Sequence, residues 1–163
     1  MRKIIIKFTI SKGFVSTILF RLFRHKYTHA AIALTMQQDE FYSFAFKGFS
    51  IEHKRHRLPT CWKENYAYYY LTVDEHRYAK LKELLEPFKN GETKYKYSCI
   101  ALVCAFFKIP YTIKDCYYCS YFVAELLVSA GIHTFDKAPS LYLPHHLAKA
   151  LSTFPHVEYT SKI

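Results

Sequence analysis

The stretch that decides the fold is Tyr118-Cys119-Ser120-Tyr121-Phe122-Val123-Ala124-Glu125-Leu126-Leu127. Its apolar side chains recur at helical spacing, which predicts a helix over 119–130 that ends at Gly131. Cys119 lies in the first turn of this helix, where unpaired N–H groups and the helix dipole favour negative charge. A thiol at that position tends towards thiolate, the nucleophilic form of cysteine. The stretch therefore predicts both a core helix and a candidate nucleophile.

Outward from this helix, the chain alternates between strand-like and helix-like segments. We expect strands, rich in β-branched and aromatic residues, over 3–10, 28–34, 40–46 and 66–73. Of these, 28–34 and 40–46 are expected to form an antiparallel hairpin, with a break at Lys47-Gly48. We expect further helices over 14–24, 75–88 (capped by Thr72 or Asp74), 95–107 and from Pro144 to about Leu151. Because the sequence shows no internal repeat and no linker, we expect residues 1–163 to form a single α+β domain.

The composition excludes some classes of protein and leaves others open. Hydrophobic residues make up 51% of the 163 residues, and 15 Tyr and 14 Phe exclude a disordered chain. The formal net charge of +10 indicates an acidic partner, such as an anionic lipid surface or nucleic acid. The densest basic run, 52–57, is interpreted as a solvated loop that can meet an anionic surface. No nucleic-acid motif accompanies the charge, so a nucleic-acid partner is not expected.

Targeting and cysteine patterns predict an unexported protein. No segment approaches the ~20 apolar residues that span a bilayer, and the apolar N-terminus lacks a small-residue cleavage site. The five cysteines are an odd number without framework spacing, as in proteins of reducing compartments. We therefore expect a cytoplasmic protein. One exception is considered: a disulfide between Cys116 and Cys119 would block the candidate nucleophile.

A histidine also departs from its local pattern. His29 begins an otherwise apolar strand, Thr28 to Leu34. An imidazole beside a helix-terminal thiol would hold it as thiolate, as cysteine hydrolases and acyltransferases require. The alternatives are a hydrogen-bonded structural histidine and a small buried cysteine, because spacing alone does not show that His29 and Cys119 meet. No metal site is expected, since Cys116-x-x-Cys119 has no second C-x-x-C or suitably spaced His pair.

Four stretches, in chain order, carry a family resemblance: 14–21, 27–34, 41–44, and 118–127 with Gly131-Ile132. Together they resemble the circularly permuted papain-like fold of the NlpC-type peptidase superfamily. The likeness is greatest to its YiiX-like branch, which includes a poxvirus protein group and is related to lecithin–retinol acyltransferase. The resemblance implies an antiparallel sheet or small barrel packed against helices. It also implies that His29 and Cys119 form a catalytic dyad.

The resemblance places a third, orienting residue on the strand after the histidine. Many relatives have a Glu, a His or another polar group there, whereas this chain offers Ser43, with Glu40 and Tyr42 as competitors. Ser43 is the residue best placed by the match, although a hydroxyl orients an imidazole more weakly than a carboxylate does. The remaining alternative is that no third residue orients His29.

These observations predict a thiol hydrolase or acyltransferase that acts on an amide, isopeptide, ester or thioester bond. Cys119, His29 and Ser43 are the expected catalytic residues, the substrate is a peptide or another acyl compound, and no cofactor is expected. The resemblance also implies that His145 and His146 lie in a helix-opening turn near the site. The alternative is a catalytically weak or inactive binding module for anionic lipid or nucleic acid.

Overall fold

The computed structural model describes residues 1–10, 27–35, 39–53, 66–91, 95–154 and 157–162. Six strands form one antiparallel sheet in the order β4-β3-β2-β1-β5-β8. Their bounds are β1 Arg2–Thr9, β2 His29–Ala33, β3 Glu40–Ala45, β4 Gly48–His53, β5 Tyr66–Val73 and β8 Val157–Lys162. Two short strands, β6 Lys96–Tyr97 and β7 Cys116–Tyr117, pair in parallel. The predicted α+β class and the antiparallel hairpin of 28–34 with 40–46 are confirmed.

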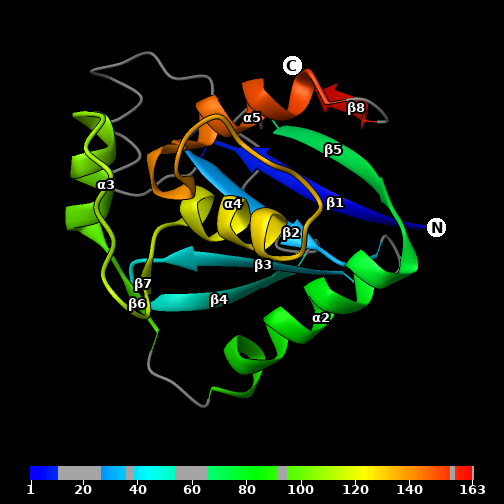
Figure 1. The fold of residues 1–163 in the computed structure, drawn as a ribbon, viewed down its shortest axis with the longest axis horizontal. Coiled ribbons are helices and arrows are strands. Elements are labelled where there is room, and N and C mark those ends of the chain that lie inside the picture. Colours follow the sequence, from blue (N-terminus) through cyan, green and yellow to red (C-terminus); the bar gives the residue numbers. More distant parts are fainter. Residues whose placement is uncertain (11–26, 36–38, 54–65, 92–94, 155–156, 163) are drawn as a thin grey trace, which may run out of the picture.

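Helices lie on one face of the large sheet (Figure 1). They are α2 Glu75–Asn90, α3 Cys99–Phe106, α4 Cys119–Ser129 and α5 Pro144–Ser152, with a 3-10 helix, η1, at Pro139–Leu141. α4 packs across β2 and β3, while α2 and α5 contact α4 from its two sides. The helix predicted over 119–130 is therefore the central helix of this layer.

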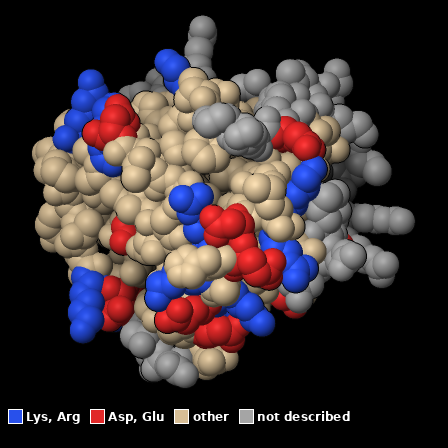
Figure 2. Space-filling model, turned by 45° about the vertical axis from the view of Figure 1, so that its right-hand side comes forward, with Lys and Arg blue, Asp and Glu red and all other residues tan. Residues whose placement is uncertain are grey.

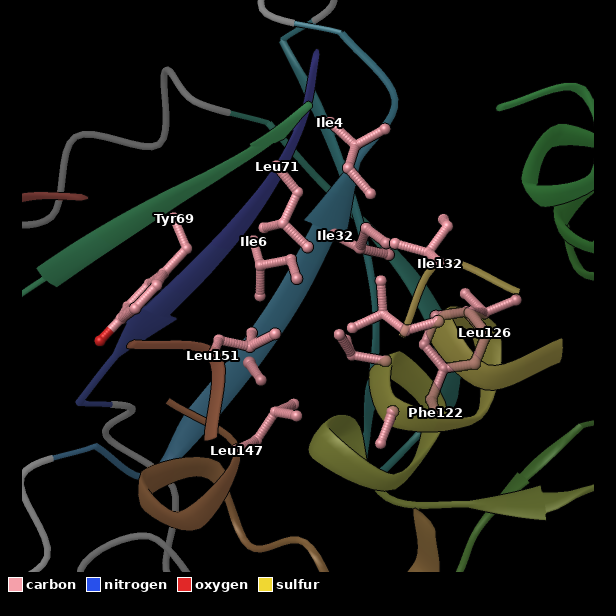
Figure 3. Close-up of a cluster of buried hydrophobic side chains, with 14 of the residues drawn as sticks. Ile4, Ile6, Ile32, Tyr69, Leu71, Phe122, Leu126, Ile132, Leu147 and Leu151 are labelled. Atoms are coloured by element: carbon pink, nitrogen blue, oxygen red, sulfur yellow. The ribbon is translucent and has the colours of Figure 1, made fainter. Parts of the chain in front are cut away.

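The core forms where the helices cover the sheet. In the close-up of Figure 3, the sheet side chains of Ile6, Ile32 and Leu71 point towards Phe122 of α4 and Leu151 of α5. All five belong to one buried cluster and are fully shielded from solvent. Alternation along the strands sends every second residue into this core, which leaves the intervening residues on the opposite face.

Local sequence signals fix several element ends. The Asp74 side chain accepts a hydrogen bond from the Arg77 N–H, so it is the cap of α2 that the sequence left open between Thr72 and Asp74. Gly131 is left-handed (φ +66°) and ends α4 as predicted. The helix predicted over 95–107 is shorter, because Lys96–Tyr97 pairs as β6 and the Ser98 side chain caps α3.

The sequence reading missed β4, β6, β7 and β8, and β4 matters for the site. The expected helix over 14–24, most of the basic run 52–57 and the turn residues 36–38 lie outside the described residues. Within the described part of the chain, no helix has the length and apolar character needed to cross a membrane.

Candidate active site

The two residues singled out in the sequence each begin a structural element. His29 is the first residue of β2, and Cys119 is the first residue of α4, which packs against that strand. The Cys119 side chain is buried and lies close enough to the His29 ring to raise the pKa of the imidazole. The structure therefore brings together the thiol and the imidazole that the sequence proposed as a dyad.

The other side of the imidazole faces a carboxylate. His29 Nε2 lies 2.5 Å from Oε1 of Glu52, and the His29 and Glu52 side chains are only 14% and 29% exposed. Ser43 Oγ lies 3.3 Å from the same nitrogen and 2.7 Å from the carbonyl oxygen of Ala30. Because its proton is donated to that carbonyl, the Ser43 hydroxyl can only accept from His29. Nε2 is thus occupied, which leaves Nδ1 as the nitrogen that can face the thiol.

These partners keep the imidazole protonated. Burial by itself lowers the pKa of His29, but hydrogen bonds to Cys119 and Glu52 and the charges of both groups outweigh it and raise the pKa to about 10. For Glu52, burial raises the pKa, yet the hydrogen bond and charge of His29, together with Lys7, bring it below its ordinary value. The Lys7 ammonium lies 3.7 Å from Glu52 Oε2. At neutral pH the site therefore holds an imidazolium next to a carboxylate.

Strand register explains how Glu52 reaches His29. Phe41 lies opposite Glu52 in the β3–β4 pair, and Ser43, two residues along β3, is on the same face as Phe41. The β2–β3 pair of Ile32 with Tyr42 puts Ser43 on the face that carries His29. The three polar side chains therefore share one face of the sheet.

Glu52 is the site residue that the sequence reading missed. Its assignment to a solvated basic loop was wrong, because it lies in β4 and is part-buried. The two competitors for the orienting role instead bond each other, since the Tyr42 hydroxyl donates to Glu40 at 2.8 Å. A usable signal was present: after Lys47-Gly48, the run from Phe49 to Glu52 alternates apolar and polar residues, as a hairpin strand does.

Two tyrosines lie near the Cys119 thiol, and the first turn of α4 has no side-chain cap. Burial and then the charge of Cys119 raise the pKa of Tyr97 and of Tyr118. The Tyr118 hydroxyl donates to the Ser140 carbonyl at 2.7 Å, which ties the start of α4 to η1. Tyr118 is also the N-cap residue of α4, but its side chain makes no capping hydrogen bond. The first-turn N–H groups, that of Cys119 among them, are therefore not used by a side-chain cap.

No cluster of His, Cys, Asp or Glu in the described segments has the arrangement of a metal site. Cys116 and Cys119 are both free thiols, so the disulfide considered from the sequence is not formed in this structure. His145 and His146 lie in the first turn of α5, the helix-opening position expected from the sequence.

The arrangement has the parts of a cysteine-based acyl-transfer centre: a thiol, an imidazolium, a carboxylate and helix N–H donors. Comparisons of the chain with protein-family models, with curated proteins and with solved structures found no match.

Proposed function

We propose that the protein is a thiol hydrolase or acyltransferase in which Cys119, His29 and Glu52 act together. One observation carries the proposal: the His29 ring is hydrogen-bonded to the Glu52 carboxylate, and Cys119 lies close enough to raise the pKa of the same ring. A structural histidine needs no nucleophile beside it, and a buried structural cysteine needs no imidazolium. A thiol, an imidazole and a group that orients the imidazole are the combination required for nucleophilic catalysis.

In the first half-reaction, the Cys119 sulfur attacks the carbonyl carbon of an amide, ester or thioester. A C–S bond forms, and the carbonyl oxygen becomes an oxyanion that the Cys119 N–H at the start of α4 can stabilise. His29 then gives its proton to the leaving nitrogen, oxygen or sulfur as the bond to the carbonyl carbon breaks. The product of this step is an acyl-enzyme on Cys119.

In the second half-reaction, the neutral His29 takes a proton from water or from an acceptor amine or hydroxyl. The resulting oxygen or nitrogen bonds to the acyl carbon, the C–S bond breaks, and the imidazolium is restored. Glu52 keeps its charge throughout and favours the imidazolium over neutral imidazole. Ser43 is a positioning residue in this scheme, because its lone pair accepts from Nε2 and holds the ring plane.

Competition between two thiols of opposite exposure tests the nucleophile. Cys99 is exposed and Cys119 is buried, so accessibility alone makes Cys99 the faster site of alkylation. We expect native protein treated with limiting iodoacetamide near pH 7 to be labelled first at Cys119, as mapped by peptide mass spectrometry. Cys119→Ala removes that label, and His29→Gln slows it while labelling of Cys99 is unchanged.

Turnover tests the reaction class. A panel of aryl esters, thioesters and peptide amides is offered to wild type, Cys119→Ala and Cys99→Ala. We expect turnover of at least one activated acyl substrate, lost by roughly a thousandfold in Cys119→Ala and retained in Cys99→Ala. Faster labelling of Cys99 than Cys119, together with equal turnover in wild type and Cys119→Ala, would contradict the proposal.

A further inference from the structure

α3 is apolar on its exposed face as well as on its buried face. Its eight residues, Cys-Ile-Ala-Leu-Val-Cys-Ala-Phe, include no charged side chain. One face packs into a cluster with the start of α4 through Ala101, Leu102 and Ala105. The other face presents Ile100 and Val103, which are 59% and 54% exposed. A helix that is apolar all round is normally buried, so the exposed face of α3 is unusual for a helix in water.

The apolar surface continues into the segment after the helix. Phe107 is 72% exposed, and three further apolar side chains between α3 and β7 are also exposed. We define the α3 surface as the six side chains of Ile100, Val103, Phe107, Ile109, Tyr111 and Ile113. Large apolar patches of this kind are rare on monomers and mark interaction sites. On the side where α3 lies in Figure 1, Figure 2 shows an uncharged surface that has both basic and acidic residues at its borders.

Lysines are interleaved with these apolar side chains. Lys108 and Lys114 are both exposed, and Asp115 is the sole acidic residue in the sequence from 98 to 118. Lys108 has a left-handed backbone (φ +59°), at the helix-ending position where glycine is usual. The N–H groups of Lys108 and Ile109 bond the carbonyls of Ala105 and Cys104, so the turn is well formed despite that strain. It places a cation between the exposed Phe107 and Ile109.

We propose that the α3 surface docks on an anionic lipid bilayer, with its apolar side chains in the headgroup–acyl boundary and its lysines against lipid phosphates. Charge complementarity selects this occupant: the surface carries Lys108 and Lys114 against the single Asp115, and it belongs to a chain of net charge +10. Exposed Phe, Ile and Val next to Lys is the composition that lies in membrane interfaces. A second copy of the same basic chain would instead bring like charges together.

The position of α3 relates this surface to the candidate site. Tyr97, just before the Ser98 cap of α3, is close enough to both Cys99 and Cys119 for their charges to raise its pKa. The buried face of α3 also packs with Tyr118, the residue before Cys119. Docking would therefore bring the thiol near acyl groups of the bilayer. The docking itself does not depend on catalysis.

Vesicle co-sedimentation tests the docking with the full chain carrying Cys119→Ala, so that its result is separate from that of any activity. The vesicles are phosphatidylcholine with about 30% phosphatidylserine, or phosphatidylcholine alone. We expect partition onto the anionic vesicles. The triple variant Ile100→Gln/Val103→Gln/Phe107→Gln should lower the partition by at least about a hundredfold, because it loses three apolar side chains that would be buried in the bilayer. Lys108→Gln/Lys114→Gln should lower it about tenfold on anionic vesicles only.

Single substitutions provide the matched comparison. Phe107→Gln on the α3 surface should weaken binding, whereas Val128→Gln, which changes an exposed apolar residue of α4, should leave it unchanged. Thermal melts check that each variant is folded. Equal partition of the triple variant and its parent would overturn the proposal. Absence of binding to the anionic vesicles would also overturn the proposal. The same holds if analytical ultracentrifugation instead shows a dimer of the parent that the triple variant abolishes.

Discussion

Replacing Glu52 by glutamine isolates the charge beside His29. Glutamine has the same length and keeps an oxygen that can accept from His29 Nε2, so the geometry of the 2.5 Å contact can persist without the charge. Two unit charges about 4 Å apart interact by about 4 kcal/mol at an effective dielectric constant near 20. With side chains 14% and 29% exposed, solvent screening reduces this to about 1.5–3 kcal/mol.

That energy has two measurable consequences. The pKa of His29, about 10 with Glu52 present, should fall towards about 8 in Glu52→Gln, which NMR titration of the imidazole measures. The imidazolium should therefore be a smaller fraction of the variant between about pH 8 and 10, where wild type still holds it. We therefore expect the alkylation rate of Cys119 at about pH 9, followed by peptide mass spectrometry, to fall by up to about tenfold.

Glu40→Gln is the matched control for this experiment. Glu40 lies on the neighbouring strand β3, but its carboxylate accepts from the Tyr42 hydroxyl. The same chemical change there should leave both the His29 pKa and the Cys119 alkylation rate unchanged. If Glu52→Gln titrates and reacts like wild type, or if Glu40→Gln has the same effect, Glu52 is not the residue that charges the imidazole.

Three further predictions concern stability. Lys108→Gly should raise the free energy of unfolding by about 0.5–1 kcal/mol in urea denaturation, because glycine adopts φ +59° without strain, and should also weaken vesicle binding. Gly48→Ala should lower the free energy of unfolding by about 2 kcal/mol or more in the same assay, because φ at this position is +100° and the added Cβ would lie 2.5 Å from the backbone carbonyl oxygen of Tyr95. The folded pKa of His29, about 10, lies above the ordinary 6.5, so its contribution is complete below about pH 6.5 and is lost as pH rises through about 10. Denaturation at several pH values should show this loss, at most about 5 kcal/mol, in wild type but not in His29→Gln.

The elements found from the sequence are those whose signals are local. β1 and β5 are runs of β-branched and aromatic residues, and α2 has a capping Asp74 and a terminal Gly91. The missed strands owe their pairing to distant segments. β8 is a polar strand paired along β5, and β6 and β7 contain two residues each and exist through their contact with one another. No pattern within such short segments separates them from loops.

The candidate site divides in the same way. His29 and Cys119 depart from their local patterns, and the family resemblance suggested that they meet. Ser43 was placed by the strand after the histidine, and it does bond His29. Glu52, by contrast, stands next to the basic residues His53 to Arg57, a pattern typical of solvated segments.

Locating Glu52 requires the register of two strand pairs in succession. The β3–β4 hairpin sets Phe41 opposite Glu52, and the β2–β3 pair then aligns that face with His29. A slip of one residue in β4 would turn Glu52 to the other face of the sheet and bring Ile51 towards the imidazole. The turn at Gly48, where no side chain fits beside Tyr95, fixes that register. The protonation state of His29 therefore depends on a glycine that touches none of the proposed catalytic atoms.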